Sequence, residues 1–258
     1  MSLVSKVLLF HDLDIGVGTG MQSPGSRWLL SKDVVVQGLN HATQSKVNFE
    51  SLDNSNNNKS VVRITIDDGG SSCMHLGELF AEKNIKAHFF IVSSFLNTKG
   101  FINHSELKTL NNMGHVIGSH SHTHPGPFCE LSYQQILDEV KISKSIIEDC
   151  IGKEVNSFSV PGGEIRLETL QQLSDKRLGL KEIYTSLPIQ GSYSNFFDPV
   201  FYGRVSIESH MSSSRISNYC KGKGWKLNLY NYQLRRFRRE LIYKFNKMRF
   251  CQIFPIKY

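Results

Sequence analysis

The sequence predicts an α/β fold with a parallel sheet, and two observations support this prediction. Short runs of strand character alternate with amphipathic runs of helical character along residues 61–163. Clusters of polar residues directly follow four of the predicted strands, and the carboxyl ends of parallel strands are where such folds carry their chemistry. The pattern is compatible with a barrel and with a doubly wound open sheet.

The predicted strands are short runs rich in β-branched and aromatic residues, bounded by polar or glycine-rich segments. They cover residues 6–10, 61–66, 86–92, 115–118 and 155–160. The polar clusters "HD", "DDGG", "SHSHTHP" and "PGG" follow the first, second, fourth and fifth of these runs. Because parallel strands end at the same edge of a sheet, we expect the four clusters to meet at one rim.

Three helices are predicted between these strands, over residues 74–84, 105–114 and 131–152. The second ends at Gly114, a residue type that commonly terminates helices. The third has the clearest signals, because Ser132 and Gln135 stand at capping-box spacing and Gly152 follows the last apolar position.

The composition indicates a soluble globular protein, with 40% hydrophobic and 21% charged residues among 258. A chain of this length can form one large α/β domain. The N-terminal apolar run is too short for a signal peptide, and no run approaches the length of a membrane span, so we expect a cytoplasmic protein. The five cysteines are scattered without a C-x-x-C pair, which predicts free thiols.

The net charge of +7 is concentrated near the C-terminus. Residues 221–258 hold eleven Lys/Arg and one acidic residue and so carry +10, whereas residues 1–220 carry −3. We therefore predict two parts, a folded barrel over 1–220 and a basic, partly helical extension over 221–258. Residues 233–250 have apolar side chains at helical spacing, which fits a helix packed on the barrel or contact with anionic headgroups at the inner membrane. Nucleic-acid binding is not expected, because nothing in the barrel region supports it.

Asp67 and Asp68 stand at a strand end, and two interpretations fit the pair. Such residues favour a turn or a helix N-cap. Alternatively, one carboxylate binds a metal ion and its neighbour acts as a base, because a divalent cation relieves the repulsion between adjacent carboxylates. His120 and His124, four residues apart, favour the second interpretation, since two histidines and one aspartate bind Zn²⁺ and leave a position open for water or substrate. His122, between them, is expected to point elsewhere.

Three segments resemble the motifs of a known family. "TIDDGG" (65–70), "HSHTH" (120–124) and "FSVPGG" (158–163) are similar, in this order, to the three leading motifs of the polysaccharide deacetylases, carbohydrate esterase family four. The resemblance covers about residues 60–165, weakens toward 210 and is absent from the tail. It implies a distorted, incomplete (β/α) barrel and metal-dependent hydrolysis of N-acetyl groups on sugars.

The resemblance also implies roles for individual residues. Asp67 matches the family's catalytic base, and the backbone N–H of Gly162 matches a donor of the oxyanion hole. The metal ligands implied are Asp68, His120 and His124. Zn²⁺ is the expected metal, with Co²⁺, Ni²⁺ and Fe²⁺ as alternatives.

The family's third motif usually begins with an arginine that orients the base, and here that position is Ser159. Arg204 in "YGRVSI", beside another possible strand, is the candidate replacement.

The family's final Leu-x-Leu-His motif, which supplies the general acid, is not visible near the C-terminus, where His210 lacks a preceding apolar strand. "VLLFHD" (7–12) resembles that motif displaced to the N-terminus. The first and last strands of a barrel are neighbours, so a circularly permuted order brings His11 to the same place. We predict His11 rather than His210 as the general acid. The alternative is a structural pairing of His11 with Asp12 or Asp14.

The resulting hypothesis is a metal-dependent sugar N-deacetylase that acts in surface-polysaccharide or O-antigen assembly. Because we expect the chain in the cytoplasm, or at the inner face of the membrane, a nucleotide- or lipid-linked precursor is favoured over finished cell wall as substrate. Two alternatives stay open: an amidohydrolase of the same fold that cleaves a non-sugar C–N bond, and a catalytically inactive barrel that binds glycan.

Overall fold

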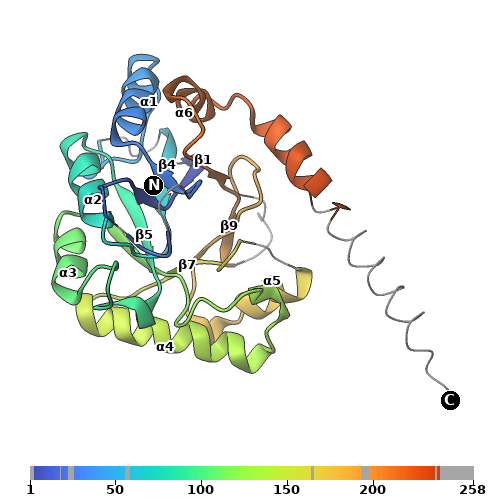
Figure 1. The fold of residues 1–258 in the computed structure, drawn as a ribbon. Coiled ribbons are helices and arrows are strands. Elements are labelled where there is room, and N and C mark those ends of the chain that lie inside the picture. Colours follow the sequence, from blue (N-terminus) through green and yellow to red (C-terminus); the bar gives the residue numbers. More distant parts are fainter. Residues whose placement is uncertain are drawn as a thin grey trace, which may run out of the picture.

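The computed structural model of the chain describes residues 3–17, 19–22, 26–55, 59–163, 166–192, 198–235 and 237–238. Within these residues, eight parallel strands form one curled sheet in the order β10-β1-β4-β5-β6-β7-β8-β9 (Figure 1). The strands are β1 (Leu3–Phe10), β4 (Ser60–Ile66), β5 (Ala87–Ile91), β6 (Val116–Ser119), β7 (Ser157–Ser159), β8 (Glu182–Tyr184), β9 (Val200–Tyr202) and β10 (Val205–Ser206). A second, two-stranded sheet consists of β2 (Asp12–Leu13) and β3 (Leu29–Leu30).

The two ends of the large sheet are joined by the chain itself. β9 and β10 stand at opposite ends of the strand order, yet only Gly203 and Arg204 separate them in the sequence. The first half of this interrupted strand pairs with β8 and the second half with β1. The sheet therefore has to curl round, which produces the distorted, incomplete barrel that the sequence predicts. Glycine fits this joint because a Cβ at Gly203 would lie 2.4 Å from the Leu187 carbonyl oxygen.

Helices cover the outer face of the curled sheet (Figure 1). They are α1 (Lys32–Gln44), α2 (Cys73–Glu82), α3 (His104–Asn112), α4 (Tyr133–Ile151), α5 (Leu167–Leu173) and α6 (Ser213–Cys220), with short 3-10 turns at Ser93–Phe95, Phe128–Glu130 and Lys176–Leu178. Residues 225–235 are also helical. α2, α3 and α4 confirm the three predicted helices.

The local signals at the helix ends are mostly confirmed. Ser132 and Gln135 form the predicted capping box of α4, and Gly152 ends that helix in the left-handed conformation. α3 begins one residue earlier than predicted, because the Asn103 side chain caps it by accepting from the Glu106 N–H at 3.0 Å.

Several elements lie outside the sequence predictions, including α1, α6, β8 and β9. α1 does carry a sequence signal, since Val35, Leu39 and Ala42 are buried at helical spacing. β8 and β9 are three residues long each, too short for a periodicity to stand out.

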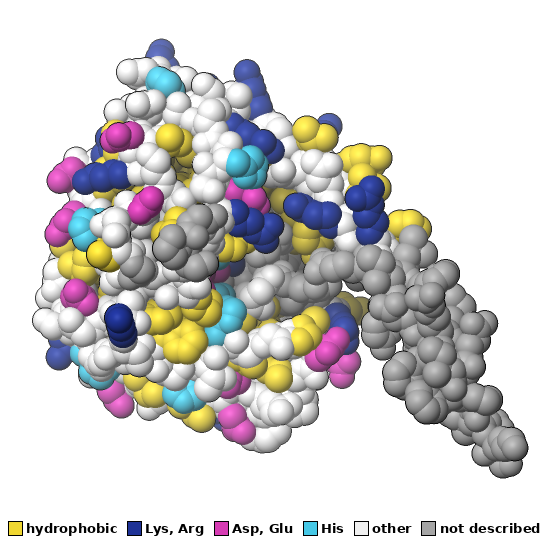
Figure 2. All heavy atoms as spheres, viewed as in Figure 1, with side chains coloured by type: hydrophobic (Ala, Val, Ile, Leu, Met, Phe, Trp, Pro, Cys, Tyr) yellow, Lys and Arg dark blue, Asp and Glu magenta, His cyan; other side chains and the backbone are white. Residues whose placement is uncertain are grey.

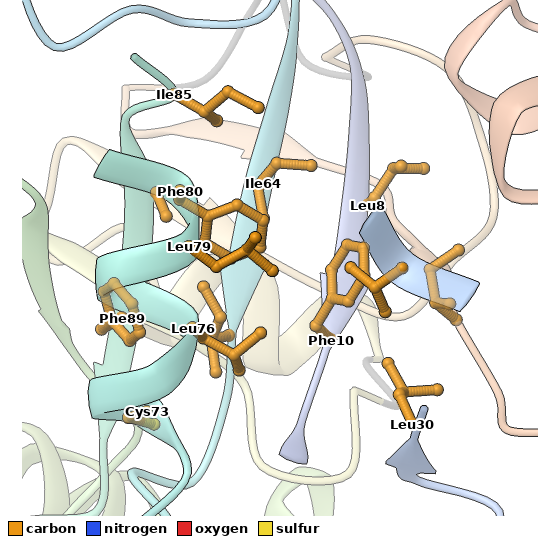
Figure 3. Packing of buried hydrophobic residues seen from close by; sticks show 14 of the residues in the cluster. Leu8, Phe10, Leu30, Ile64, Cys73, Leu76, Leu79, Phe80, Ile85 and Phe89 are labelled. Atoms are coloured by element: carbon orange, nitrogen blue, oxygen red, sulfur yellow. The ribbon is translucent and has the colours of Figure 1, made fainter. Parts of the chain in front are cut away.

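The core between α2 and the sheet is made of interleaved aliphatic and aromatic side chains (Figure 3). The apolar face of α2 lays Leu76 and Phe80 over Ile64 of β4 and Phe10 of β1 (Figure 3). The Phe10 and Phe80 rings meet edge to face, with centroids 6.1 Å apart. This packing anchors β1 and β4, whose ends carry the site described below.

A second feature of the barrel interior is a buried charge cluster around Arg63 of β4. The Arg63 guanidinium contacts Glu50 at 2.6 Å, Glu182 at 2.9 Å and the Tyr184 hydroxyl. Burial alone would raise the pKa of both glutamates, but His88 and Arg63 outweigh it and hold each pKa below the ordinary value of 4.5. The charges are therefore mutually compensated inside the barrel.

The C-terminal prediction is only partly within the described residues. Trp225 is buried and donates from Nε1 to the Tyr219 carbonyl at 3.0 Å, which attaches the helix over 225–235 to α6. Of the amphipathic segment predicted over 233–250, residues 236 and 239–250 lie outside the described part of the chain. Cys73, Cys129, Cys150 and Cys220 are free thiols as predicted, and Cys251 lies outside the described residues. No helix in the described ranges has the length and apolar character needed to cross a bilayer.

The Arg63 cluster predicts a stability effect. Arg63→Leu is expected to lower the free energy of unfolding by about 3–5 kcal/mol, because two buried carboxylates lose their cation. Urea denaturation at neutral pH measures this loss. Arg177→Leu is the matched control, because that guanidinium is 63% exposed in its pair with Asp175 and its loss is expected to cost less than about 1 kcal/mol. Equal effects of the two substitutions would contradict the prediction.

The same cluster predicts how stability depends on pH. Because the folded-state pKa values of Glu50 and Glu182 lie below 4.5, their contribution is present above pH 4.5 and is lost as the pH falls through the folded values. Unfolding curves measured between pH 6 and pH 3 should therefore show a shallower acid loss in Arg63→Leu than in the wild type.

Candidate active site

His11 and Asp67 follow adjacent strands in matched register. β1 and β4 pair in parallel with Phe10 opposite Ile66, and the Asp67 N–H donates to the Phe10 carbonyl at 3.1 Å. The next residue of each strand is therefore His11 or Asp67. β1 also pairs with β10, so the strands of this sheet that come first and last in the sequence are neighbours, as the permuted order predicts.

Arg204 lies against Asp67 in the barrel interior. Its Nη1 and Nη2 donate to Asp67 Oδ1 and Oδ2 at 2.8 and 2.9 Å, a bidentate geometry that suits a guanidinium and a carboxylate. Both side chains are buried, with 0% and 4% exposure. Arg204 Nη2 also donates to Ser159 Oγ at 2.8 Å, and Ser159 Oγ donates to Asp67 Oδ2 at 2.9 Å. The structure thus brings Arg204 to the predicted base, Asp67, next to Ser159, the position at which the sequence lacks the expected arginine.

These surroundings keep Asp67 ionised. Burial alone would raise the pKa of this carboxyl group, but the positive charge of Arg204 and the nearby His120 outweigh it, so the pKa lies well below its ordinary range. A carboxyl group with a low pKa is a carboxylate at neutral pH. Asp67 is therefore able to accept a proton there.

Asp68, His120 and His124 bring three ligand atoms within 4.8 Å of one another. His120 Nε2 lies 3.4 Å and His124 Nε2 3.9 Å from Asp68 Oδ1. Ligands bound at about 2.1 Å to a tetrahedral zinc ion lie about 3.4 Å apart, so this spacing suits a shared cation. His122 points elsewhere, as expected, with its Nδ1 2.9 Å from Ser93 Oγ.

A hydrogen bond behind His120 determines its tautomer. Nδ1 lies 2.8 Å from the Ser159 carbonyl oxygen, which can only accept, so Nδ1 carries the proton. Nε2 is then the ring nitrogen that a cation between His120 and Asp68 would bind, an arrangement typical of metal-ligating histidines. Ser159 therefore serves both halves of the site, through its hydroxyl to Asp67 and through its carbonyl to His120.

Two of the three ligands have a left-handed backbone conformation. φ is +77° at Asp68 and +56° at His124, and Asp and His are among the non-glycine residues that adopt this region most readily. Glu139 of α4 holds the histidine loop by accepting from the N–H groups of His122 at 2.9 Å and Thr123 at 2.8 Å. Such conformations cost about 1–3 kcal/mol each and cluster at ligand sites, where the surroundings enforce them.

The pKa values of the two ligand histidines move in opposite directions. Burial lowers the pKa of His124, and His120 lowers it further. Burial would also lower the pKa of His120, but Asp67 and Asp68 outweigh it, and the pKa is raised. The site therefore favours positive charge beside the aspartates, the electrostatic condition for binding a cation.

The donor set fits a divalent cation of the zinc type. Two imidazole nitrogens and one carboxylate oxygen leave a coordination position open for water or substrate. Within the described ranges this is the one group of three or more His, Cys, Asp and Glu side chains with suitable spacing. Zn²⁺, Co²⁺, Ni²⁺ and Fe²⁺ all accept such ligands, so the donors do not distinguish between them.

All seven predicted site residues line one cavity of about 740 Å³. They are His11, Asp67, Asp68, His120, His124, Gly162 and Arg204. The cavity is of the size that binds small organic ligands.

Both candidates for the general acid line the cavity, but their burial and contacts differ. The His11 ring packs against Trp28 at a tilt of 34°, with ring centroids 4.5 Å apart, and its buried Nδ1 has no hydrogen-bond partner among the described residues. Asp12 accepts from Thr19 and Ser72, and Asp14 accepts from the Gly16 N–H, so the structural pairing of His11 with either aspartate is not found. His210 also lines the cavity, but its side chain is 59% exposed and its Nδ1 lies 3.5 Å from Glu208.

Three contributors were not identified from the sequence: Trp28 beside His11, Glu139 under the histidine loop, and Ser159 as a hydrogen-bonding partner. Nothing in the spacing of these residues indicates their contacts, because each belongs to a segment brought in by the fold. Position 159 stood out in the sequence only because a serine occupies the place of the expected motif arginine.

Comparisons with known proteins agree with this geometry. The family model "Polysaccharide deacetylase" matches residues 54–183. Chitin deacetylase 1 of Cryptococcus neoformans var. grubii is 32% identical over 108 residues, which is 42% of this chain and 22% of that protein. The chain thus spans only a part of this curated relative's length.

Solved structures show the same fold at low sequence identity. A polysaccharide deacetylase from Bacillus cereus superposes with a TM-score of 0.68 at 17% identity, covering 83% of this chain and 68% of that one. The Streptococcus pyogenes deacetylase PplD, solved with acetate, gives 0.68 at 19% identity, covering 83% and 97%. IcaB from Ammonifex degensii gives 0.66 at 17% identity, covering 85% and 98%.

The match to the family model extends over half of the chain and includes the aspartate pair and the histidine motif. The chain therefore belongs to the polysaccharide deacetylase family.

The roles assigned to Asp67 and His120 predict different defects. Asp67→Asn is expected to reduce turnover at least 100-fold while bound metal is retained, because an amide cannot act as the base. His120→Ala is expected to lose metal and activity together. Metal content by emission spectroscopy and acetate release measure the two effects. His122→Ala, which changes a histidine outside the cluster, should keep both, and full activity in Asp67→Asn would disprove the assignment of the base.

The contact between Arg204 and Ser159 predicts that an arginine at position 159 can partly replace Arg204. Arg204→Ser should lower activity about 100-fold or more and destabilise the fold by about 3–5 kcal/mol, because Asp67 stays buried without its cation. Adding Ser159→Arg should restore part of the activity and part of the stability, since the side chain at position 159 faces the Asp67 carboxylate. Activity and urea denaturation of the single and double variants measure this. A double variant no better than Arg204→Ser would contradict a shared role.

Proposed function

We propose that this protein is a metal-dependent N-deacetylase of sugars, with Zn²⁺ as the expected metal. The observation that carries the proposal is the pairing of two units in one cavity. One is a three-ligand cluster at Asp68, His120 and His124, and the other is a buried, ionised carboxylate at Asp67. Family membership supports hydrolysis of acetyl groups as the reaction class.

The residues of the chain account for the parts of such a reaction. A divalent cation held by the cluster would polarise the acetyl carbonyl and make water more acidic. Asp67, 3.7 Å from His120 Nε2, accepts the proton of the attacking water. Arg204 keeps Asp67 oriented and ionised while the proton is transferred.

Two further groups complete the site. The Gly162 N–H is proposed as a donor to the developing oxyanion, a type of contact that contributes about 2.7–4 kcal/mol in other enzymes. The backbone at Gly162 has φ of +67°, a conformation that suits glycine. His11, packed on Trp28, donates a proton to the departing amine, which is a poor leaving group unless protonated.

The substrate is proposed to be an N-acetylated sugar or glycan used in surface-polysaccharide or O-antigen assembly, in a nucleotide- or lipid-linked form. The names of the relatives support an acetylated polysaccharide as the general class. An amidohydrolase of the same fold remains a second candidate, because the same groups can cleave other C–N bonds. A glycan-binding barrel without activity is disfavoured by the intact ligand set and the paired Asp67.

Acetate release from a panel of N-acetyl sugars tests this function. The metal-loaded wild type is expected to release acetate from at least one of them, and His11→Ala is expected to reduce kcat about 100-fold or more with metal content unchanged. His210→Ala is the matched control and should keep kcat within about twofold. Unchanged kcat in His11→Ala would exclude it as the acid, and cleavage of non-sugar amides alone would favour the amidohydrolase.

The location of the protein is also a proposal: the cytoplasm, with contact between the basic C-terminal residues and the inner membrane. The charge of residues 221–258 supports it. The full chain is expected to sediment with anionic vesicles at low salt and not with neutral ones, and no sedimentation with either would remove the membrane contact.

A further inference from the structure

Four arginines line the same cavity as the catalytic groups. Arg27 precedes β3, Arg215 is on α6, and Arg235 and Arg238 belong to the C-terminal helical residues. Figure 2 shows Lys and Arg side chains on the flank formed by α6 and these helical residues. The fold thus brings to one cavity cationic side chains that are far apart in the sequence. We call these four residues the arginine wall.

Within the part of the chain that the structure describes, the arginine wall has no acidic partner. Elsewhere on the surface, Arg166 pairs with Glu130 at 3.0 Å and Arg177 with Asp175 at 2.8 Å. Over the described ranges, no carboxylate lies within 4.0 Å of any wall guanidinium. The acidic residue beside the wall, Glu208, lies 3.5 Å from His210 instead.

Two of these guanidinium groups are already oriented. The Arg27 guanidinium lies over the Trp28 ring, 4.3 Å from its centroid. Arg215 donates from Nε to the Tyr219 hydroxyl at 3.0 Å, which leaves its two terminal nitrogens available. A preoriented, unpaired guanidinium loses little freedom when it binds an anion.

The chemistry of the wall favours phosphate as the anion. Several guanidinium groups beside one cavity match the several oxygens and the multiple charge of a phosphate or diphosphate ester. A neutral sugar offers these cations no opposite charge. Because the wall and the catalytic groups line one cavity of about 740 Å³, one ligand can reach both.

We propose that the arginine wall binds the phosphate of a substrate whose N-acetyl sugar is esterified to phosphate or diphosphate. This inference rests on the proposed deacetylase function and specifies its substrate class. A nucleotide and a lipid can both supply the phosphate ester, and the wall recognises their shared chemistry. The acetyl group then lies at Asp67 and the metal ligands, with the phosphate toward α6.

The test compares two sugars that differ in the phosphate. The metal-loaded wild type should show kcat/KM at least about tenfold higher for N-acetylglucosamine 1-phosphate than for the methyl glycoside of N-acetylglucosamine at low salt. Arg27→Gln combined with Arg215→Gln should remove most of this preference through KM, and leave the methyl glycoside within about twofold. Lys226→Gln, which removes a positive charge on the C-terminal helix outside the cavity, should keep the preference.

Two further substrates distinguish a nucleotide from a lipid as the source of the phosphate. UDP-N-acetylglucosamine and a polyprenyl diphosphate N-acetylglucosamine in detergent are compared with the 1-phosphate, and a lower KM for either supports the wall and identifies the carrier. No preference for any phosphate-bearing sugar in the wild type, or a preference unchanged in the double variant, would overturn the proposal.

Calorimetry separates this inference from the proposed function. One outcome is that the wild type binds N-acetylglucosamine 1-phosphate and the double variant does not, while no sugar releases acetate. This result would support phosphate binding by the arginine wall and exclude the proposed deacetylase function. Acetate release without such binding would support the deacetylase function and exclude phosphate binding by the arginine wall.

Discussion

The buried pair between Arg204 and Asp67 is the interaction on which the rest of the site depends. Arg204 stands at the joint between β9 and β10, where the two ends of the sheet meet, and Asp67 directly follows β4. Removing either partner would leave an uncompensated charge in the barrel, a cost of about 3–5 kcal/mol. The residue at the joint of the barrel is therefore also the one that keeps Asp67 ionised.

The metal ligands are attached to this pair through short links. Asp68 is the next residue in the chain, and His120 is oriented by the carbonyl of Ser159, whose hydroxyl bonds to both Arg204 and Asp67. The left-handed backbone at Asp68 and His124 is unfavourable in isolation, but the surrounding strands and α4 enforce it. Base and metal site are thus one connected polar network, in which a change at one member is expected to affect the others.

The order of the strands places the N-terminal strand in the middle of neighbours that come later in the sequence. A barrel has no first strand in space, so a strand can move to the other end of the sequence without changing its neighbours. β1 pairs with β10 on one side and β4 on the other, which places His11 beside Asp67. The same closure brings α6 and the C-terminal helix to the rim, so the arginine wall faces the catalytic groups.

The sequence by itself determined the parallel strands that end in polar clusters, the caps of α4, and the grouping of Asp68 with His120 and His124. These depend on local propensity and spacing, which neighbouring residues carry. Only the tertiary structure decided that Arg204 reaches Asp67, that Ser159 links both halves of the site, and that residues beyond 220 line the cavity. Those contacts join residues up to 137 positions apart, as for Arg204 and Asp67, and no local pattern encodes a contact made by closing a barrel.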